Sequence, residues 1–363
     1  MKAFVTGATG FIGKRLVHRL VERGDQVVAL VRSPEAARAI QAMGASAAIG
    51  DILDFESMQA GMLGCDVVFH LAGWYKLGAR DIQPAEAINV QGTLNVLGLA
   101  HQLGVPRIIY TSTIAVLGDT QGYVADETYQ SQAEHFLTEY DRTKWMAHYK
   151  VALPLIAKGA PVIILMPGAV YGPGDPSLVG DIMRLFYRGF LPVLPGPELT
   201  LTFAHVDDVA EGHLLAAEKG KPGESYLLTG PILSLGQVAQ VWAEISGRRA
   251  PVLQIPARFI KLLAPIVAAL GAYLPLPAII SKDAIAILEA TYIACADKAQ
   301  AELGWQARPV EEGMRQTFDA LAKTIQPVKL LPQDPARCRQ LAGAALGAAI
   351  GLLLAWWITR RRK

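Results

Sequence analysis

The sequence predicts an α/β protein with a doubly wound parallel sheet, a smaller C-terminal lobe and a C-terminal transmembrane helix. Three observations predict this arrangement. Apolar strand-like runs alternate with helical segments through the first half of the chain, as in a parallel sheet covered by helices on both faces. A glycine-rich turn follows the first run, and an uncharged segment of 18 residues lies near the C-terminus.

The first half contains six strand candidates, each a short apolar run bounded by turn residues. They are Ala3–Thr6, Gln26–Val31, Ala45–Ile49, Asp66–Leu71, Arg107–Thr111 and Pro161–Met166. Helical periodicity between them is clearest in Lys14–Glu22 and Glu86–Leu103. The alternation of strand and helix therefore favours the doubly wound sheet.

Beyond Pro167 the chain becomes rich in proline and glycine, which predicts shorter elements and loops. We expect a sheet domain over residues 1–175 and a substrate lobe over 176–325, with some strands of the lobe returning to the main sheet. A linker (326–340), a membrane helix (341–359) and a basic end (360–363) would follow.

Composition excludes several classes of protein. Of the 363 residues, 52% are hydrophobic and 18% are charged, and the net charge is +2. Six basic residues and no acid lie in 337–363, so removing six from +2 leaves −4 for residues 1–336. A mildly acidic body argues against a nucleic-acid partner. Three widely spaced cysteines form no disulfide framework and no metal pattern, so we expect a reducing compartment and no metal site.

The C-terminal segment Leu341–Ile358 carries no charge and, as a helix, would be about 27 Å long, close to the hydrocarbon thickness of a bilayer. Trp356 and Trp357 precede four basic residues, an order typical of a membrane interface. We predict a membrane anchor, with an apolar docking helix as the alternative. Glycines at every fourth position (Gly343, Gly347, Gly351) would also allow a homodimer through this helix.

The location of the protein is predicted from two further cues. No apolar leader precedes the first strand, so the catalytic body is expected in the cytoplasm. The basic residues after the anchor favour a cytoplasmic C-terminus instead, which leaves the side of the last four residues open. Leu262–Ile280 is also uncharged, but its three prolines favour short helices at an apolar pocket over a spanning helix; an interfacial segment is the alternative.

The glycine-rich turn follows the first strand directly and leads into a helix. Its sequence, Thr6 to Gly13, reads TGATGFIG. Glycines let the backbone approach a pyrophosphate, whose charge the free N–H groups at a helix N-terminus bind. The turn predicts a dinucleotide site made by Gly7, Thr9, Gly10, Phe11, Ile12 and Gly13.

Residues at the ends of the next strands would complete the cofactor site. Arg32 takes the place at which an acid holds the ribose of NAD, and its guanidinium suits the 2′-phosphate of NADP. NADP is therefore favoured and NAD is possible. Asp51 could accept from the adenine amine, and the remaining candidates are Ile52, Leu71, Ala72 and Gly73. His70 is interpreted as a structural histidine.

A catalytic group is predicted from Ser112 and from Tyr140 with Lys144. The tyrosine and the lysine lie four residues apart, so on a helix they share a face and the ammonium could lower the pKa of the phenol. None of the other ten tyrosines has a lysine four residues later. We predict that Tyr140 exchanges a proton with the substrate while Ser112 supports the developing oxyanion.

These motifs resemble the extended short-chain dehydrogenase/reductases, also called the NAD-dependent epimerase/dehydratase family. The resemblance runs from Lys2 to about Phe318 and also includes HLAG (70–73) and PGAVYGPGD (167–175). Within the family, NVQGT (89–93) and TFAHVDDVAEGHLLAAEKG (202–220) resemble proteins like dihydroflavonol reductase, 3β-hydroxysteroid dehydrogenase and hopanoid-associated sugar epimerases.

The resemblance implies a Rossmann-type fold and a role for each matching residue. Tyr140 would be the acid/base, and Lys144 would lower its pKa and hold the nicotinamide ribose. Ser112 would bond the reacting oxygen, and Pro167 and Gly168 would border the nicotinamide. Asn89 would be structural or part of a relay. The residues 205–207 would be architectural.

Three functions are compatible with these residues. The leading one is an NADP-dependent oxidoreductase that transfers a hydride to or from a hydrophobic small molecule, because the predicted lobe is mostly apolar. A nucleotide-sugar epimerase or dehydratase is the first alternative, although only Arg184 and Arg188 could meet a diphosphate between residues 176 and 204. A non-catalytic, membrane-tethered dinucleotide-binding protein is the second.

Overall fold

The structure is a computed structural model that describes residues 1–79, 81–131, 135–191, 193–251, 253–262, 264–265 and 281–325. Its centre is a parallel sheet of seven strands in the order β10-β6-β5-β4-β1-β2-β3. In that order the strands are Ser225–Leu228, Val162–Pro167, Ile108–Thr111, Val67–His70, Lys2–Thr6, Gln26–Val31 and Ser46–Ile49. The chain reverses its direction of winding between β1 and β4, so the predicted doubly wound sheet is confirmed.

All six predicted strands form, with small differences at their ends. β3, β4, β5 and β6 each begin one residue later than expected, and β1 begins one residue earlier. β4 ends at His70 instead of Leu71, and β6 extends to Pro167. The interior strands are buried on both faces: every residue of β4 and β6 is buried. Continuous apolar runs are what a parallel sheet between two helical layers requires, which is why the runs located the strands so well.

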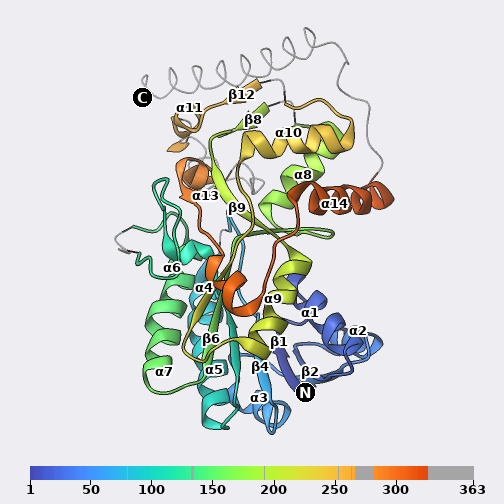
Figure 1. Cartoon of the computed structure of the whole chain (residues 1–363), viewed down its shortest axis with the longest axis vertical. Helices are drawn as coiled ribbons and strands as arrows, with labels where there is room; N and C mark the ends of the chain where they lie inside the picture. Colours follow the sequence, from blue (N-terminus) through green and yellow to red (C-terminus); the bar gives the residue numbers. More distant parts are fainter. Residues whose placement is uncertain are drawn as a thin grey trace, which may run out of the picture.

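Helices cover both faces of this sheet (Figure 1). On one face α1 (Phe11–Glu22) and α9 (Val206–Lys219) pack through Leu16, Leu20 and Leu214. On the other face α3 (Phe55–Met62) and α5 (Gly92–Gln102) bury Met58, Val96 and Leu97. The remaining helices of this domain are α2 (Pro34–Ala42), α4 (Gln83–Glu86), the π-helix η1 (Ala87–Gln91), the 3-10 helix η2 (Ile114–Leu117), α6 (Glu139–Trp145), the π-helix η3 (Met146–Ala152) and α7 (Leu153–Ala157).

A second lobe stands over the carboxyl ends of the central strands (Figure 1). Its strands are β7 (Ala169–Tyr171), β8 (Val193–Pro195), β9 (Thr200–His205), β11 (Ile232–Ser234), β12 (Leu253–Ile255) and β13 (Thr291–Tyr292). Its helices are α8 (Leu178–Arg188), α10 (Leu235–Ser246), α11 (Ala257–Lys261), α13 (Lys282–Ala286), η5 (Ile287–Glu289) and α14 (Val310–Thr324). The π-helix η6 (Ala299–Leu303) instead packs against α9 and β10 of the sheet domain. A separate core that includes Phe186, Trp242 and Met314 holds α8, α10 and α14 together.

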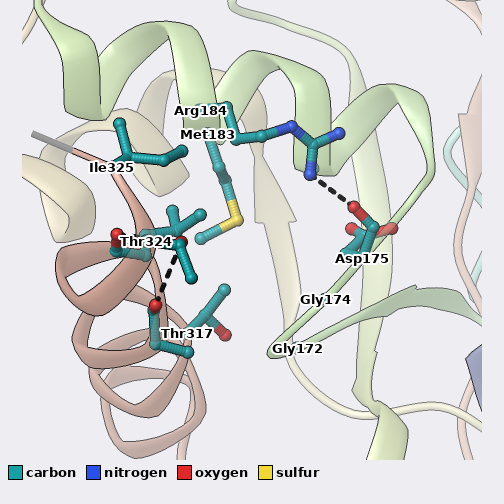
Figure 2. A pocket seen from close by; sticks show the side chains of 11 residues that line it. Gly172, Gly174, Asp175, Met183, Arg184, Thr317, Thr324 and Ile325 are labelled. Carbon is teal, nitrogen blue, oxygen red and sulfur yellow. Dashed lines mark hydrogen bonds between the residues drawn. The ribbon is translucent and has the colours of Figure 1, made fainter.

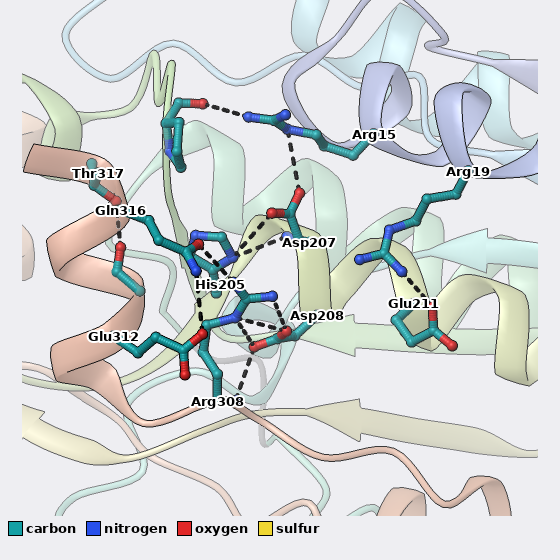
Figure 3. A network of polar contacts seen from close by, with 12 residues as sticks. Arg15, Arg19, His205, Asp207, Asp208, Glu211, Arg308, Glu312, Gln316 and Thr317 are labelled. Carbon is teal, nitrogen blue, oxygen red and sulfur yellow. Dashed lines mark hydrogen bonds and ion pairs between the residues drawn. The ribbon is translucent and has the colours of Figure 1, made fainter. Parts of the chain in front are cut away.

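A polar network joins α9 of the sheet domain to the segment before α14 (Figure 3). The Arg308 guanidinium donates to both carboxylate oxygens of Asp208, with N···O distances from 2.6 to 3.1 Å. The backbone N–H of Arg308 donates to the same carboxylate at 3.0 Å. His205 caps the start of α9 by accepting from the Asp207 N–H. This geometry agrees with the architectural role predicted for residues 205–207.

The predicted linker, membrane helix and basic end (326–363) lie outside the described residues. So do residue 263 and residues 266–280 of the second uncharged segment. Within the ranges that the structure describes, none of the helices is both long and apolar enough to cross a bilayer.

Candidate active site

The glycine-rich turn has a backbone that requires glycine at two positions. Gly7 has a φ of +71°, and a Cβ there would lie 2.6 Å from the backbone nitrogen of Ala72. A Cβ at Gly13 would collide with the carbonyl of Gly7. Helix α1 starts after Gly10 without a side-chain cap and with no acid in its first turn. Its free N–H groups are therefore available for a phosphate.

One cavity of about 520 Å³ extends from this turn to the second lobe. It brings together most of the predicted site: Gly7, Gly10, Phe11, Ile12, Gly13, Leu71, Gly73, Ser112, Tyr140, Lys144, Pro167 and Gly168. These residues lie up to 161 positions apart in the chain, but the carboxyl ends of the parallel strands bring them to one edge of the sheet. The cavity therefore unites the predicted cofactor and catalytic residues.

Five predicted cofactor residues do not line this cavity: Thr9, Arg32, Asp51, Ile52 and Ala72. Thr9 follows the carboxyl end of β1 and Arg32 that of β2, and both residues are exposed. The Asp51 carboxylate accepts from the Leu53 N–H at 2.9 Å. The side chain of Ile52 is 7% exposed and belongs to the core, and Ala72 donates its N–H to Thr6 at 3.3 Å. A direct side-chain role for Ile52 is therefore not supported by its position.

Lys144 and Tyr140 line the same cavity, and the hydrogen bonds of Lys144 are made with the residues at the end of β5. Its ammonium, on the buried face of α6, donates to the Thr111 carbonyl at 2.8 Å and to the Tyr110 hydroxyl at 3.3 Å. Burial lowers the pKa of Lys144 to about 7. Burial raises the pKa of Tyr140 to about 12, against the effect of the Thr113 hydroxyl. The pKa of Tyr140 thus shifts upward instead of downward, because burial is the largest effect on it.

Tyr140 is held at the start of α6 by local contacts. Thr138 and Asp141 form a capping box, in which each side chain accepts from the other residue's backbone N–H. The ring of Tyr75 meets that of Tyr140 edge-on, with centroids 4.9 Å apart. Tyr140 thus occupies a defined place in the cavity wall, within the first turn of a capped helix.

Ser112 has a partner that the sequence interpretation missed. Its Oγ lies 2.9 Å from Nδ1 of His148, and both side chains are buried. The prediction also missed Tyr110, whose hydroxyl accepts from Lys144, and Thr113, whose hydroxyl interacts with Tyr140. The only available signal for His148 was its position four residues after Lys144, and a periodic position alone does not distinguish a polar contact from helix packing.

His70 and Asn89 belong to a buried network below the site. The two ring nitrogens of His70 contact Thr6 at 2.8 Å and Thr93 at 3.0 Å. Burial lowers the pKa of His70 to about 3, so the ring stays neutral. Asn89 accepts from the Trp74 N–H at 2.7 Å and donates to Thr143 at 2.9 Å. Both side chains hold elements together, as the structural interpretation of His70 requires.

The part of the cavity under the second lobe is largely apolar. Its walls are formed by Trp74, Tyr75, Leu77, Ile114, Leu178, Val179, Ile182, Leu199, Leu201, Phe203, Leu235, Ile287 and Tyr292. Lys144 is the only lysine or arginine among the described lining residues. Arg184 instead lines a second cavity between α8 and α14, where it donates to the Asp175 carbonyl at 2.6 Å (Figure 2). Neither Arg184 nor Arg188 is among the described residues that line the main cavity, so from these lining residues a diphosphate would meet no basic side chain except Lys144.

The profile of the NAD dependent epimerase/dehydratase family matches residues 3–229. The chain belongs to this family. It is therefore an enzyme of the extended short-chain dehydrogenase/reductase type, in an NAD(P)-dependent family with a Rossmann-type fold. The resemblance inferred from the motifs is confirmed.

Two curated members of the family resemble this chain over most of its length. The sterol demethylase protein B of Methylococcus capsulatus is 33% identical over 267 residues, 73% of this chain and 80% of that protein. The 4-hydroxy-2-methyl-3-oxo-4-farnesyl-3,4-dihydroquinoline-1-oxide ketoreductase of Stigmatella aurantiaca is 35% identical over 328 residues, 88% of this chain and 96% of that protein. A further relative is named a 3-beta-hydroxysteroid dehydrogenase.

A solved structure shows the same architecture. The UDP-glucose 4-epimerase of Thermotoga maritima, crystallised with UDP-glucose, superposes with a TM-score of 0.71. It is 25% identical, and the match covers 90% of this chain and all of the epimerase chain. The family thus includes both reductases and epimerases. Which of the two reactions this chain catalyses has to be inferred from the residues that line its cavity.

Proposed function

We propose that this enzyme is an NADP-dependent reductase or dehydrogenase of a hydrophobic carbonyl or hydroxyl compound. The observation that carries the proposal is the composition of the main cavity. The glycine-rich turn, Ser112, Tyr140 and Lys144 share it, and the space beyond them has apolar walls. Such a site suits an apolar substrate whose single reacting oxygen meets a few placed polar groups.

The residues at the turn fit a dinucleotide. A Cβ at Gly7 would meet the backbone of Leu71 and Ala72, and one at Gly13 would meet the Gly7 carbonyl, so the two glycines allow the tight turn; the uncapped start of α1 lines the cavity. These groups would hold the pyrophosphate. When bound, the nicotinamide supplies or accepts the hydride. Pro167 and Gly168 line the cavity at the end of β6, where they would border it.

The chain's own groups would handle the proton. In the reducing direction Tyr140 gives its hydroxyl proton to the substrate oxygen, and in the oxidising direction it takes that proton back. Ser112 donates a hydrogen bond to the same oxygen while negative charge develops on it. In its protonated form Lys144 places a positive charge 4.9 Å from the centre of the Tyr110 ring and against the carbonyl of Thr111, which precedes Ser112. This charge would stabilise the anionic form of a group that reacts nearby.

The names of relatives support an apolar substrate. One is a ketoreductase whose named substrate carries a farnesyl group, and another is named for sterol demethylation. The lipid-soluble character of such compounds agrees with the apolar walls of the cavity. We therefore place the substrate of this enzyme among sterol, polyprenyl or similarly hydrophobic carbonyl compounds.

A nucleotide-sugar epimerase is the alternative function, and one of the comparisons agrees with it. The epimerase of Thermotoga maritima shares the fold, and the family name covers both reactions. Against it, the described lobe offers the main cavity no arginine or lysine for a diphosphate. NADPH consumption separates the two, because an epimerase returns its cofactor unchanged. Purified protein should oxidise NADPH with hydrophobic carbonyls and not with nucleotide-sugar carbonyls; the opposite pattern would contradict the reductase proposal.

The preference for NADP rests on Arg32. Replacing Arg32 with Asp should weaken NADPH binding about 10- to 100-fold, the worth of a charge-assisted phosphate contact, and should improve NADH relative to NADPH. Arg38→Asp makes the same charge change at an exposed arginine, on α2, that pairs with Glu35, and should leave both affinities nearly unchanged. Fluorescence titration with each nucleotide measures the ratio. An equal loss in both variants would show that only general charge attracts the nucleotide.

We also propose that residues 341–358 anchor the enzyme in a membrane with its catalytic body in the cytoplasm. The support is the uncharged length, the two tryptophans and the basic end. A chain ending at Pro335 should leave the membrane fraction, whereas the full chain should remain there after a high-salt wash. If the shortened chain stayed in the washed membranes, Leu262–Ile280 would become the candidate segment.

A further inference from the structure

Ser112 and His148 form a buried contact in which the histidine has no role in the proposed reaction. His148 is four residues beyond Lys144 along a continuous helical segment, and the segment changes from α-helix to π-helix at Met146. Single π-helical turns within α-helices occur often at functional sites. Here the His148 ring meets Ser112, which follows β5, at 2.9 Å. The helix that carries Tyr140 and Lys144 therefore also supplies a partner for the serine.

The hydrogen bond between them constrains the protons. Burial, together with the charge of Lys144, lowers the pKa of His148 to about 4, so the ring is neutral near pH 7. A neutral imidazole carries its proton on one nitrogen only, and the other nitrogen is an acceptor. If Nδ1 lacks the proton, it accepts the Ser112 hydroxyl proton and directs it away from the cavity. If Nδ1 carries the proton, it donates to Oγ and leaves the serine proton free.

Only the second arrangement lets Ser112 donate to a substrate oxygen. Ser112 has one proton and lines the main cavity, and its side chain also interacts with the hydroxyl of Tyr110. We propose that His148 is a positioning residue whose Nδ1–H donates to Ser112 Oγ and thereby directs the serine hydroxyl proton to the reacting oxygen. This proposal rests on the proposed reductase function, because it assigns how the serine of that site is oriented.

Turnover of a carbonyl compound that the enzyme reduces tests the proposal through a double-mutant cycle. Ser112→Ala should lower kcat about 100-fold, as the loss of an oxyanion donor does. His148→Phe, which keeps a ring but cannot donate, should lower kcat about 10- to 100-fold through misdirection of that donor. The Kd for NADPH should change less than about 3-fold in either variant, since no phosphate contact is lost. His148→Asn, whose amide can replace the Nδ1–H, should restore most of kcat.

The decisive comparison is the double variant. If His148 acts through Ser112, His148→Phe should have almost no further effect on kcat in the Ser112→Ala background. If the fold-losses in kcat of the two single variants multiply in the double variant, His148 acts independently of Ser112 and the proposal is overturned. A wild-type kcat in His148→Phe would overturn it as well. Absence of NADPH oxidation with every hydrophobic carbonyl compound would instead contradict the reductase function itself, so the two failures are distinguishable.

A second measurement needs neither turnover nor stability of the Phe variant. Nitrogen-15 NMR of the uniformly labelled full chain reports which ring nitrogen of each of the seven histidines is protonated. The spectrum of His148→Asn identifies the His148 signals by their loss. A proton on Nδ1 at pH 7 is the expected result, and a proton on Nε2 would overturn the proposal.

Discussion

Replacing Tyr140 by Phe should lower kcat about 10²- to 10⁴-fold, the range for loss of a placed general acid. The change removes one hydroxyl from the wall of the cavity and leaves the capping box of Thr138 and Asp141 intact. Stability and NADPH binding should therefore change little. Initial rates of NADPH oxidation with the best carbonyl substrate measure the effect, and a thermal melt of each protein verifies folding.

Tyr75→Phe is the matched control for this experiment. Tyr75 lines the same cavity and its ring contacts that of Tyr140, so the control removes the same atom from a neighbouring tyrosine. Its kcat should stay within about 3-fold of the wild-type value, because it transfers no proton in the proposed reaction. Equal losses in the two variants would mean that cavity polarity, and not a specific proton donor, limits the rate. Full activity in Tyr140→Phe would show that Tyr140 is not the proton donor.

Replacing Arg308 by Leu should lower the free energy of unfolding by about 3 kcal/mol, at the lower end of values for breaking a buried pair. The Arg308 and Asp208 side chains are 18% and 11% exposed, so removal of the cation leaves a largely buried carboxylate without its partner. Arg308 also donates to Gln316 of α14 at 2.7 Å (Figure 3). Urea unfolding followed by circular dichroism measures the difference.

Arg19→Leu is the control for the Arg308 variant. Arg19 pairs with Glu211, but these side chains are 34% and 43% exposed, so the loss should be below about 1 kcal/mol. Replacing both Asp208 and Arg308 by Leu should recover part of the lost stability, because no buried charge then remains. If Arg308→Leu costs no more than Arg19→Leu, the Asp208 pair does not hold the two lobes together.

The strands and the cofactor turn could be predicted from the chain because local patterns determine them. A strand buried on both faces reads as an apolar run, and Val162–Pro167 is such a run. The positions of Gly7 and Gly13 follow from the close approach of backbone that a dinucleotide turn needs. The spacing of Tyr140 and Lys144 likewise indicates a shared helix face without reference to the rest of the fold.

The direction of the polar groups in the site depended on packing between distant segments. Lys144 meets Thr111 and Tyr110, 33 and 34 residues earlier, and burial raises the pKa of Tyr140. His148 meets Ser112, 36 residues earlier, through a π-helical stretch that a periodic pattern does not show. Sequence periodicity reports which face of a helix is buried, but the partner of a buried donor is chosen by the neighbouring element. Burial by that element also shifts the pKa values, and only the assembled fold determines it.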